Sequence, residues 1–196
     1  MKSRGRSLSL PFALPPSIKS AQISVLPEFY GAEPIARGSW NRLEAFQPSV
    51  LIGYAYDLTR LADAVEKGDI LLTTVDRAIY ALTDVGTPVI DDALRHKLWR
   101  VFGVPVYEII VAPGCMLLAG ECELHNGWHL QPGIEAHCIE NEIVYETGRI
   151  AQAYTGYTGT IDSSRCECGR NTPALKGLHP LIRHRQARPP ALPLAS

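Results

Sequence analysis

The first half of the chain alternates between short apolar runs and stretches with the periodicity of an amphipathic helix. Asp57 and Asp91 each precede a helical pattern, and Gly68 and Gly103 follow the two patterns, which is the usual order of capping residues. The predicted strands of this half cover residues 49–54, 70–75, 78–83 and 104–111. Strands that alternate with helices are typical of an α/β layer with a mostly parallel sheet.

The pattern changes after Pro113, where short apolar pieces are separated by turn-forming residues such as Asn126-Gly127 and Pro132-Gly133. These pieces cover residues 116–125, 128–131, 135–139, 142–146 and 150–157. Frequent turn signals between short strands are typical of antiparallel hairpins. The second half is therefore predicted to be β-rich, with no linker separating it from the first half.

The two ends of the chain differ from this central region. Residues 1–27 hold four basic residues, no acidic residue and several prolines that break an apolar run, which favours a flexible arm over a signal peptide. Residues 179–196 are rich in arginine and proline and are predicted to be a flexible tail. A single domain is expected over residues 28–178.

The composition narrows the classes of function. The chain has 196 residues, 46% of them hydrophobic and 20% charged, with a formal net charge of −1. Such a balance is typical of an ordinary globular protein and argues against nucleic-acid binding through bulk positive charge. No apolar run has the length of a membrane-spanning helix. The odd count of five cysteines disfavours a disulfide framework and favours a reducing, cytoplasmic location.

Cysteine and histidine gather in two clusters of the second half. The first cluster contains Cys122, His125 and His129, and the second is the sequence Cys166-Glu-Cys168-Gly. Two separated groups of soft and borderline ligands are the usual source of a tetrahedral zinc site. The sequence therefore predicts one zinc ion, and four protein ligands would make it structural because they leave no open position.

Strand geometry selects between the two histidines. A two-residue turn at Asn126-Gly127 would place His129 opposite Leu124, on the same sheet face as Cys122, and would point His125 away. We therefore predict Cys122, His129, Cys166 and Cys168 as ligands. His125 is the alternative ligand if the turn is wider.

Four neighbouring residues are left outside this set. Cys115 and Cys138 are expected to pack as small apolar side chains. Glu121 and Glu123 flank Cys122, and either a supporting role behind the metal ligands or a solvated strand face fits them from sequence alone.

Several of these segments, in this order, resemble the phenylacetate-CoA ligase-like group of the adenylate-forming acyl-CoA ligases. The resemblance runs over residues 46–175 and rests on four segments, at residues 46–58, 94–107, 121–129 and 166–173. It implies part of the adenylate-forming scaffold, a sheet with helices followed by a hairpin-rich zinc-knuckle region. In zinc-carrying members, the matching Cys, Gly-x-His and Cys-x-Cys-Gly-Arg positions form a metal site, which supports His129.

The family activates a carboxylic acid with ATP and passes the acyl group to coenzyme A, but its catalytic motifs are not intact in this sequence. No Gly/Ser/Thr-rich phosphate loop is present, and residues 110–114 (Ile-Val-Ala-Pro-Gly) stand where the magnesium-binding Tyr-Gly-x-x-Glu is expected. Tyr157 replaces the aspartate that grips the ribose, and Lys176 does not match the lysine of the family's mobile C-terminal domain. Binding of ATP, Mg²⁺ or CoA is therefore not predicted.

Three hypotheses follow. The first is a zinc-binding relative of these ligases that is inactive alone and acts as a binding or accessory subunit, with a protein partner or a second copy of itself. The second is one part of a split AMP-forming acid–CoA ligase. The third is a zinc-ribbon module that binds other proteins. None of them predicts a nucleic-acid or membrane partner.

Overall fold

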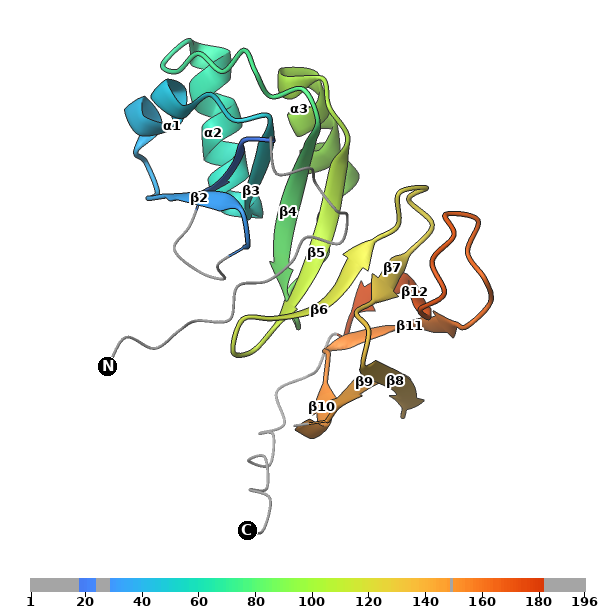
Figure 1. Ribbon diagram of the computed structural model, residues 1–196. Coiled ribbons are helices and arrows are strands. Elements are labelled where there is room, and N and C mark those ends of the chain that lie inside the picture. The colour runs from blue at the N-terminus through green and yellow to red at the C-terminus, as the bar shows by residue number, and fades with distance from the viewer. Residues whose placement is uncertain (1–17, 24–28, 149, 182–196) are drawn as a thin grey trace, which may run out of the picture.

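The computed structural model describes residues 18–23, 29–148 and 150–181 (Figure 1). The first half contains β1 (Ser20–Ile23), β2 (Ala32–Ile35), α1 (Trp40–Phe46), β3 (Val50–Tyr54), α2 (Ala55–Lys67), β4 (Ala78–Asp84), α3 (Asp92–Phe102) and β5 (Val106–Ala112). The second half contains β6 (Met116–Glu121), β7 (Trp128–Leu130), β8 (Ile134–Ile139), β9 (Glu142–Thr147), β10 (Ile150–Tyr154), β11 (Tyr157–Asp162) and β12 (Ala174–Pro180). The predicted division into an α/β half and a β-rich half is confirmed.

One nine-stranded sheet runs through both halves, in the order β11-β12-β7-β6-β5-β4-β3-β1-β2. The strands from β2 to β5 pair in parallel, and those from β5 to β11 pair antiparallel. The antiparallel strands thus extend the parallel sheet, and consecutive strands such as β6 and β7 pair antiparallel, as the predicted hairpins require. A second, three-stranded sheet has the order β10-β9-β8.

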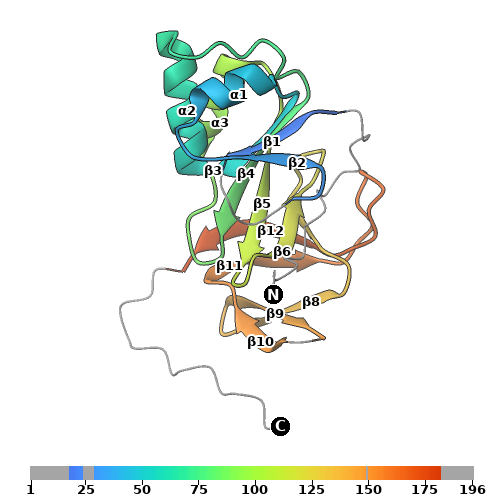
Figure 2. The same cartoon turned by 60° about the vertical axis from the view of Figure 1, so that its left-hand side comes forward.

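The helices and the small sheet cover different parts of the large sheet. Figure 2 shows α1, α2 and α3 gathered at the parallel half, and apolar side chains such as Leu43, Leu61 and Leu98 join one buried cluster with Ile79. Below them, the three-stranded sheet packs on the antiparallel half through a second apolar cluster that includes Tyr145. None of the helices within the described residues is long and apolar enough to cross a lipid bilayer.

The helix boundaries confirm three of the four predicted caps. The Asp91 carboxylate accepts a 2.8 Å hydrogen bond from the Leu94 N–H and caps α3. Gly68 and Gly103 end α2 and α3 in the left-handed conformation that favours glycine. Asp57 is not a cap: α2 begins earlier, at Ala55, and the buried Asp57 carboxylate instead pairs with Arg37 at 2.9 Å.

Three other boundary predictions are wrong. The flexible arm was expected to include residues 20–23, but these form β1, whose neighbours in the sheet are β2 and β3. The tail was expected from His179, yet β12 continues to Pro180. Residues 70–75 do not form a strand. They are held by side chains instead, since the Gln47 amide bonds both the Leu71 carbonyl and the Thr73 N–H. The remaining parts of the predicted arm and tail, residues 1–17, 24–27 and 182–196, lie outside the described residues.

Candidate metal centre

Strand pairing brings the two cysteine and histidine clusters together. Cys122 follows the last residue of β6, and His129 is the middle residue of β7. Cys166 and Cys168 lie in the connection between β11 and β12. β12 pairs with β7, with Ala174 opposite His129, and β7 pairs in turn with β6. The connection between β11 and β12 therefore lies beside the end of β6.

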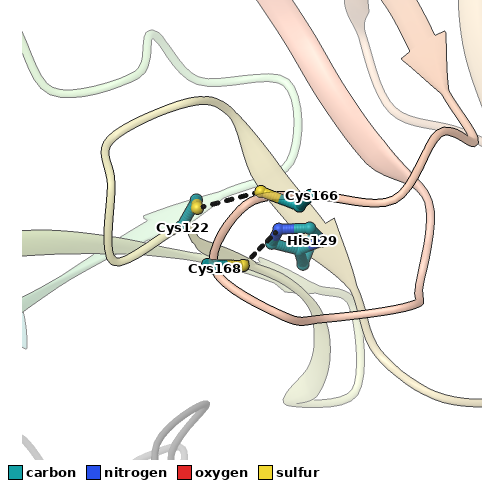
Figure 3. A group of neighbouring side chains, drawn as sticks. All are labelled: Cys122, His129, Cys166 and Cys168. Atoms are coloured by element: carbon teal, nitrogen blue, oxygen red, sulfur yellow. Dashed lines mark hydrogen bonds between the residues drawn. The ribbon is translucent and has the colours of Figure 1, made fainter.

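All four predicted ligand residues converge on one point (Figure 3). One donor atom from each of Cys122, His129, Cys166 and Cys168 lies within 4.8 Å of the other three. The Cys122 and Cys166 sulfurs are 3.6 Å apart, and His129 Nε2 is 3.3 Å from the Cys168 sulfur. Ligands at about 2.3 Å (sulfur) and 2.0 Å (nitrogen) from a tetrahedral ion are separated by roughly 3.5–3.8 Å. The arrangement therefore fits a metal ion of the size and geometry of zinc.

The surroundings favour cation binding by His129 and Cys166, whereas burial raises the pKa of Cys168 to about 11, so this thiol would lose its proton to a bound metal. His129 donates its Nδ1–H to the Thr172 carbonyl at 2.9 Å, which leaves the Nε2 lone pair directed at the cluster. A hydrogen bond from the Cys168 backbone N–H is the largest of the effects that lower the pKa of Cys166 to about 6, and this favours the thiolate. The sulfur of Cys122 accepts the Leu124 N–H at 3.4 Å. A cavity of about 250 Å³ is lined in part by Cys166.

The turn prediction that selected His129 is itself wrong. In the observed register Gly120 is opposite His129 and Glu121 is opposite Trp128, so residues 122–127 form a wider connection than the predicted two-residue turn. His125 nevertheless does not join the cluster. Its Nδ1 lies 2.9 Å from Glu121 Oε1, and its ring stacks on Tyr107 at a centroid distance of 5.1 Å.

The two other cysteines lie outside the cluster. Both were expected to pack as small apolar side chains, and Cys115 is only partly buried, in the turn between β5 and β6. The same expectation is wrong for Cys138, which is exposed on β8.

A buried carboxylate pair beside the cluster was not predicted. Glu108 of β5 is completely buried and accepts hydrogen bonds from the Thr83 hydroxyl, the Ile90 N–H and the Trp128 indole N–H. Glu121 is buried as well, and Arg95 of α3 lies 2.9 Å from Glu121 and 3.7 Å from Glu108. The available signal was an acidic residue inside the apolar run at 104–111, a position that requires hydrogen-bonding partners.

Glu108 predicts a pH dependence of stability. Burial raises its pKa from 4.5 to about 7, against the opposing hydrogen bonds and the Arg95 charge. Between these two pH values the unfolded chain loses the proton that the folded chain retains, so the free energy of unfolding should fall as pH rises, by about 3 kcal/mol in total. Below pH 4.5 and above pH 7 this contribution should be constant.

Urea unfolding of the wild type and Glu108→Gln between pH 5 and 8 measures this effect. Histidines and thiols titrate in both proteins and cancel in the comparison. The wild type should lose more stability than the variant as pH rises; parallel pH profiles would contradict the assignment to Glu108.

The residues compared above with catalytic motifs of the ligases, including Lys176, which matches none of them, have other contacts in this fold. Ile110, Val111 and Ala112 are buried apolar residues of β5. Tyr157 is fully buried, and its hydroxyl donates to the Thr87 carbonyl. Lys176 pairs with Asp162 at 2.7 Å on the neighbouring strand.

Comparison with known proteins finds similarity in structure alone. No protein-family model and no curated protein matches the sequence. Among solved structures, an open conformation of 2-hydroxyisobutyryl-CoA ligase with 2-HIB-AMP and CoA matches with a TM-score of 0.66 and 14% identity, over 83% of this chain and 44% of the ligase. Coronafacic acid ligase from Pectobacterium brasiliense has a TM-score of 0.56 at 12% identity, over 85% and 40% of the two chains.

A long-chain-fatty-acid–CoA ligase from Archaeoglobus fulgidus has a TM-score of 0.54 at 13% identity, over 84% of this chain and 41% of the ligase. The chain thus spans less than half the length of each of these three structures. The family resemblance drawn from the sequence motifs is confirmed at the level of fold. This protein has the fold of part of an adenylate-forming acyl-CoA ligase.

Proposed function

We propose that this protein is a zinc-binding accessory or binding subunit that uses part of the adenylate-forming ligase fold and forms no acyl-adenylate on its own. The observation that carries the proposal is a contrast within one fold. The four metal-ligand side chains converge. By contrast, the position expected to hold magnesium is Gly114, an exposed turn residue without a side chain, and the position expected to hold the ribose is the buried Tyr157.

The donor set supports zinc and a structural role for it. Three thiols and one imidazole are ligands that zinc prefers over hard cations such as Mg²⁺. Four protein donors complete a tetrahedral shell, so no position is left for a substrate or an activated water. Thiol ligands must stay reduced, which is consistent with our proposal of a cytoplasmic location.

The replaced motifs support the absence of adenylation. Magnesium at an ATP site is normally held by carboxylate oxygens and screens the phosphate charge. Residues 110–114, the positions that match the family's carboxylate motif, contain no acidic side chain. Tyr157 directs its hydroxyl into the protein, toward the carbonyl groups of Asp84 and Thr87, and offers no carboxylate to a ribose.

Zinc content and pyrophosphate exchange together test the proposal. Freshly purified protein should contain one zinc ion per chain by elemental analysis. It should catalyse no carboxylate-dependent exchange of pyrophosphate into ATP over a panel of short, branched, aromatic and long-chain acids. Absence of metal would refute the zinc assignment, and exchange above that of a heat-inactivated control would refute the inactive role.

The partial coverage of the ligases favours a second candidate function. Because the chain matches only 44% of a complete ligase, a second polypeptide could supply the phosphate loop and the mobile domain of a split acid–CoA ligase. Purification of the native protein under mild conditions identifies its partners. If this chain is an accessory subunit, it should co-purify with a protein that is not a ligase fragment. A ligase fragment that gains acid-dependent exchange when this chain is added would favour the split enzyme instead.

A further inference from the structure

The two glutamates that flank Cys122 have opposite environments. Glu121 is 5% exposed, whereas the Glu123 side chain is 53% exposed and lies 3.6 Å from Arg170. Both oxygens of Glu121 are used. Oε2 lies 2.9 Å from Arg95 and accepts the Glu108 N–H at 2.7 Å, and Oε1 accepts the Nδ1–H of His125 at 2.9 Å. These contacts hold the Glu121 side chain in place, directly before Cys122 in the chain.

The connection at residues 122–127 is held in a specific conformation. The Cys122 carbonyl accepts the His125 N–H at 2.8 Å, and the Cys122 N–H donates to the Gly127 carbonyl at 2.8 Å. His125 has a φ of 53°, in the left-handed region that is unfavourable for a residue with a Cβ atom. Interactions elsewhere must compensate for this strain. Two act on the His125 side chain, the contact with Glu121 and the stacking on Tyr107.

These contacts bear on the metal because this connection carries one of the ligands. The Cys122 sulfur accepts the Leu124 N–H, so its direction depends on the backbone of the connection. If His125 were released, the connection could relax out of the left-handed conformation and turn the sulfur away from Cys166, 3.6 Å distant.

We propose that Glu121 is a positioning residue for the metal centre, which acts through His125 to hold the 122–127 connection in the conformation that aims Cys122 at the other ligands. The proposal rests on zinc binding, the proposed function of the site. Groups that orient metal ligands from behind typically change metal affinity by 10-fold to 100-fold when they are removed. Arg95 and Glu108 would contribute by keeping the Glu121 carboxylate in place.

Zinc affinity of matched variants tests this role, measured by competition with a chromogenic chelator at pH 7.5. Glu121→Gln should weaken zinc binding by about 10-fold to 100-fold. Glu123→Gln, on the other side of Cys122, should change the affinity by less than about 3-fold, because its side chain is exposed. His125→Ala alters only a half-exposed side chain, so it tests the same contact if Glu121→Gln does not fold. It should weaken binding to a similar extent.

Two further measurements separate positioning from a general loss of stability. Leu98→Ala removes buried volume from α3 and should destabilise the protein, yet should leave the zinc affinity close to that of the wild type. The double variant Glu121→Gln/His125→Ala should bind zinc no more weakly than the weaker single variant, because both changes break one contact.

The results distinguish the proposals. A wild type without zinc would refute the proposed function of the site. A wild type that binds zinc, together with Glu121→Gln and His125→Ala variants of unchanged affinity, would overturn only the positioning role. Additive losses in the double variant, or an equal loss in Leu98→Ala, would overturn the positioning role as well.

Discussion

Replacing Cys122 with serine should abolish stoichiometric zinc binding and lower the melting temperature by roughly 10 °C or more. Cys122 is buried and converges with the other three ligands. A hydroxyl is a poor zinc ligand at neutral pH, and a metal that binds only the folded state adds its binding free energy to the stability. Elemental analysis and thermal unfolding of the purified variant measure the two effects.

Cys138→Ser is the matched control for this experiment. It makes the same chemical change at an exposed cysteine of β8 that lies outside the cluster. This variant should retain full zinc content and a melting temperature within about 2 °C of the wild type. Wild-type zinc content in Cys122→Ser would refute the ligand assignment.

Gly127→Ala should destabilise the protein by roughly 3–5 kcal/mol. Gly127 has a φ of 97°, and a Cβ atom there would lie 2.5 Å from the Leu175 carbonyl oxygen of β12. The substitution therefore adds steric overlap with a neighbouring strand to the strain of a left-handed residue. Because Gly127 ends the connection that begins at Cys122, a loss of zinc affinity should accompany the loss of stability. Urea unfolding and chelator competition measure both.

Gly133→Ala separates the two components of this cost. Gly133 has a similar φ of 82°, but nothing lies within 4 Å of a Cβ atom placed there. It should lose only about 1–2 kcal/mol, the cost of left-handed strain. Equal losses in both variants would mean that β12 moves to accommodate the new methyl group, in contradiction to the predicted overlap.

The sequence predicts most of the parallel half because the signals there are local. The Asp91 cap, the glycines that end α2 and α3, and the apolar strands β3, β4 and β5 are each specified by residues a few positions apart. The predictions fail where distant side chains decide the outcome. Residues 70–75 are apolar enough for a strand, but the Gln47 amide supplies hydrogen bonds that a sheet would otherwise provide.

The four residues predicted as ligands lie together in the structure, although the turn that was used to select His129 is not formed. Ligand chemistry and the spacing of the second cluster indicated the same four residues that converge in the structure. The hairpin register was wrong because Asn126-Gly127 forms part of a wider connection, whose internal bonds involve Cys122 and His125. His129 still faces the cluster, since its position is set by pairing with both β6 and β12.

The environments of Glu108 and Glu121 could not be derived from sequence. Each is an acidic residue in a strand, and its carboxylate could be solvated by water or paired with a buried basic side chain. The choice depends on Arg95, which reaches both carboxylates from α3. Contacts between elements that are distant in sequence are decided by the assembled fold, and local pattern carries no information on them.

The distance along the chain between the ligands has a consequence for the unfolded protein. Cys122 and Cys166 are separated by 44 positions, and β7 to β11 lie between them. In the chain-entropy treatment, closing a loop of this length costs an unfolded chain about 4 kcal/mol, so the metal binds poorly until folding has brought the two cysteines together. The ion is then a cross-link that a chelator can remove without any redox chemistry. The stability of the antiparallel half would therefore depend on the concentration of available zinc.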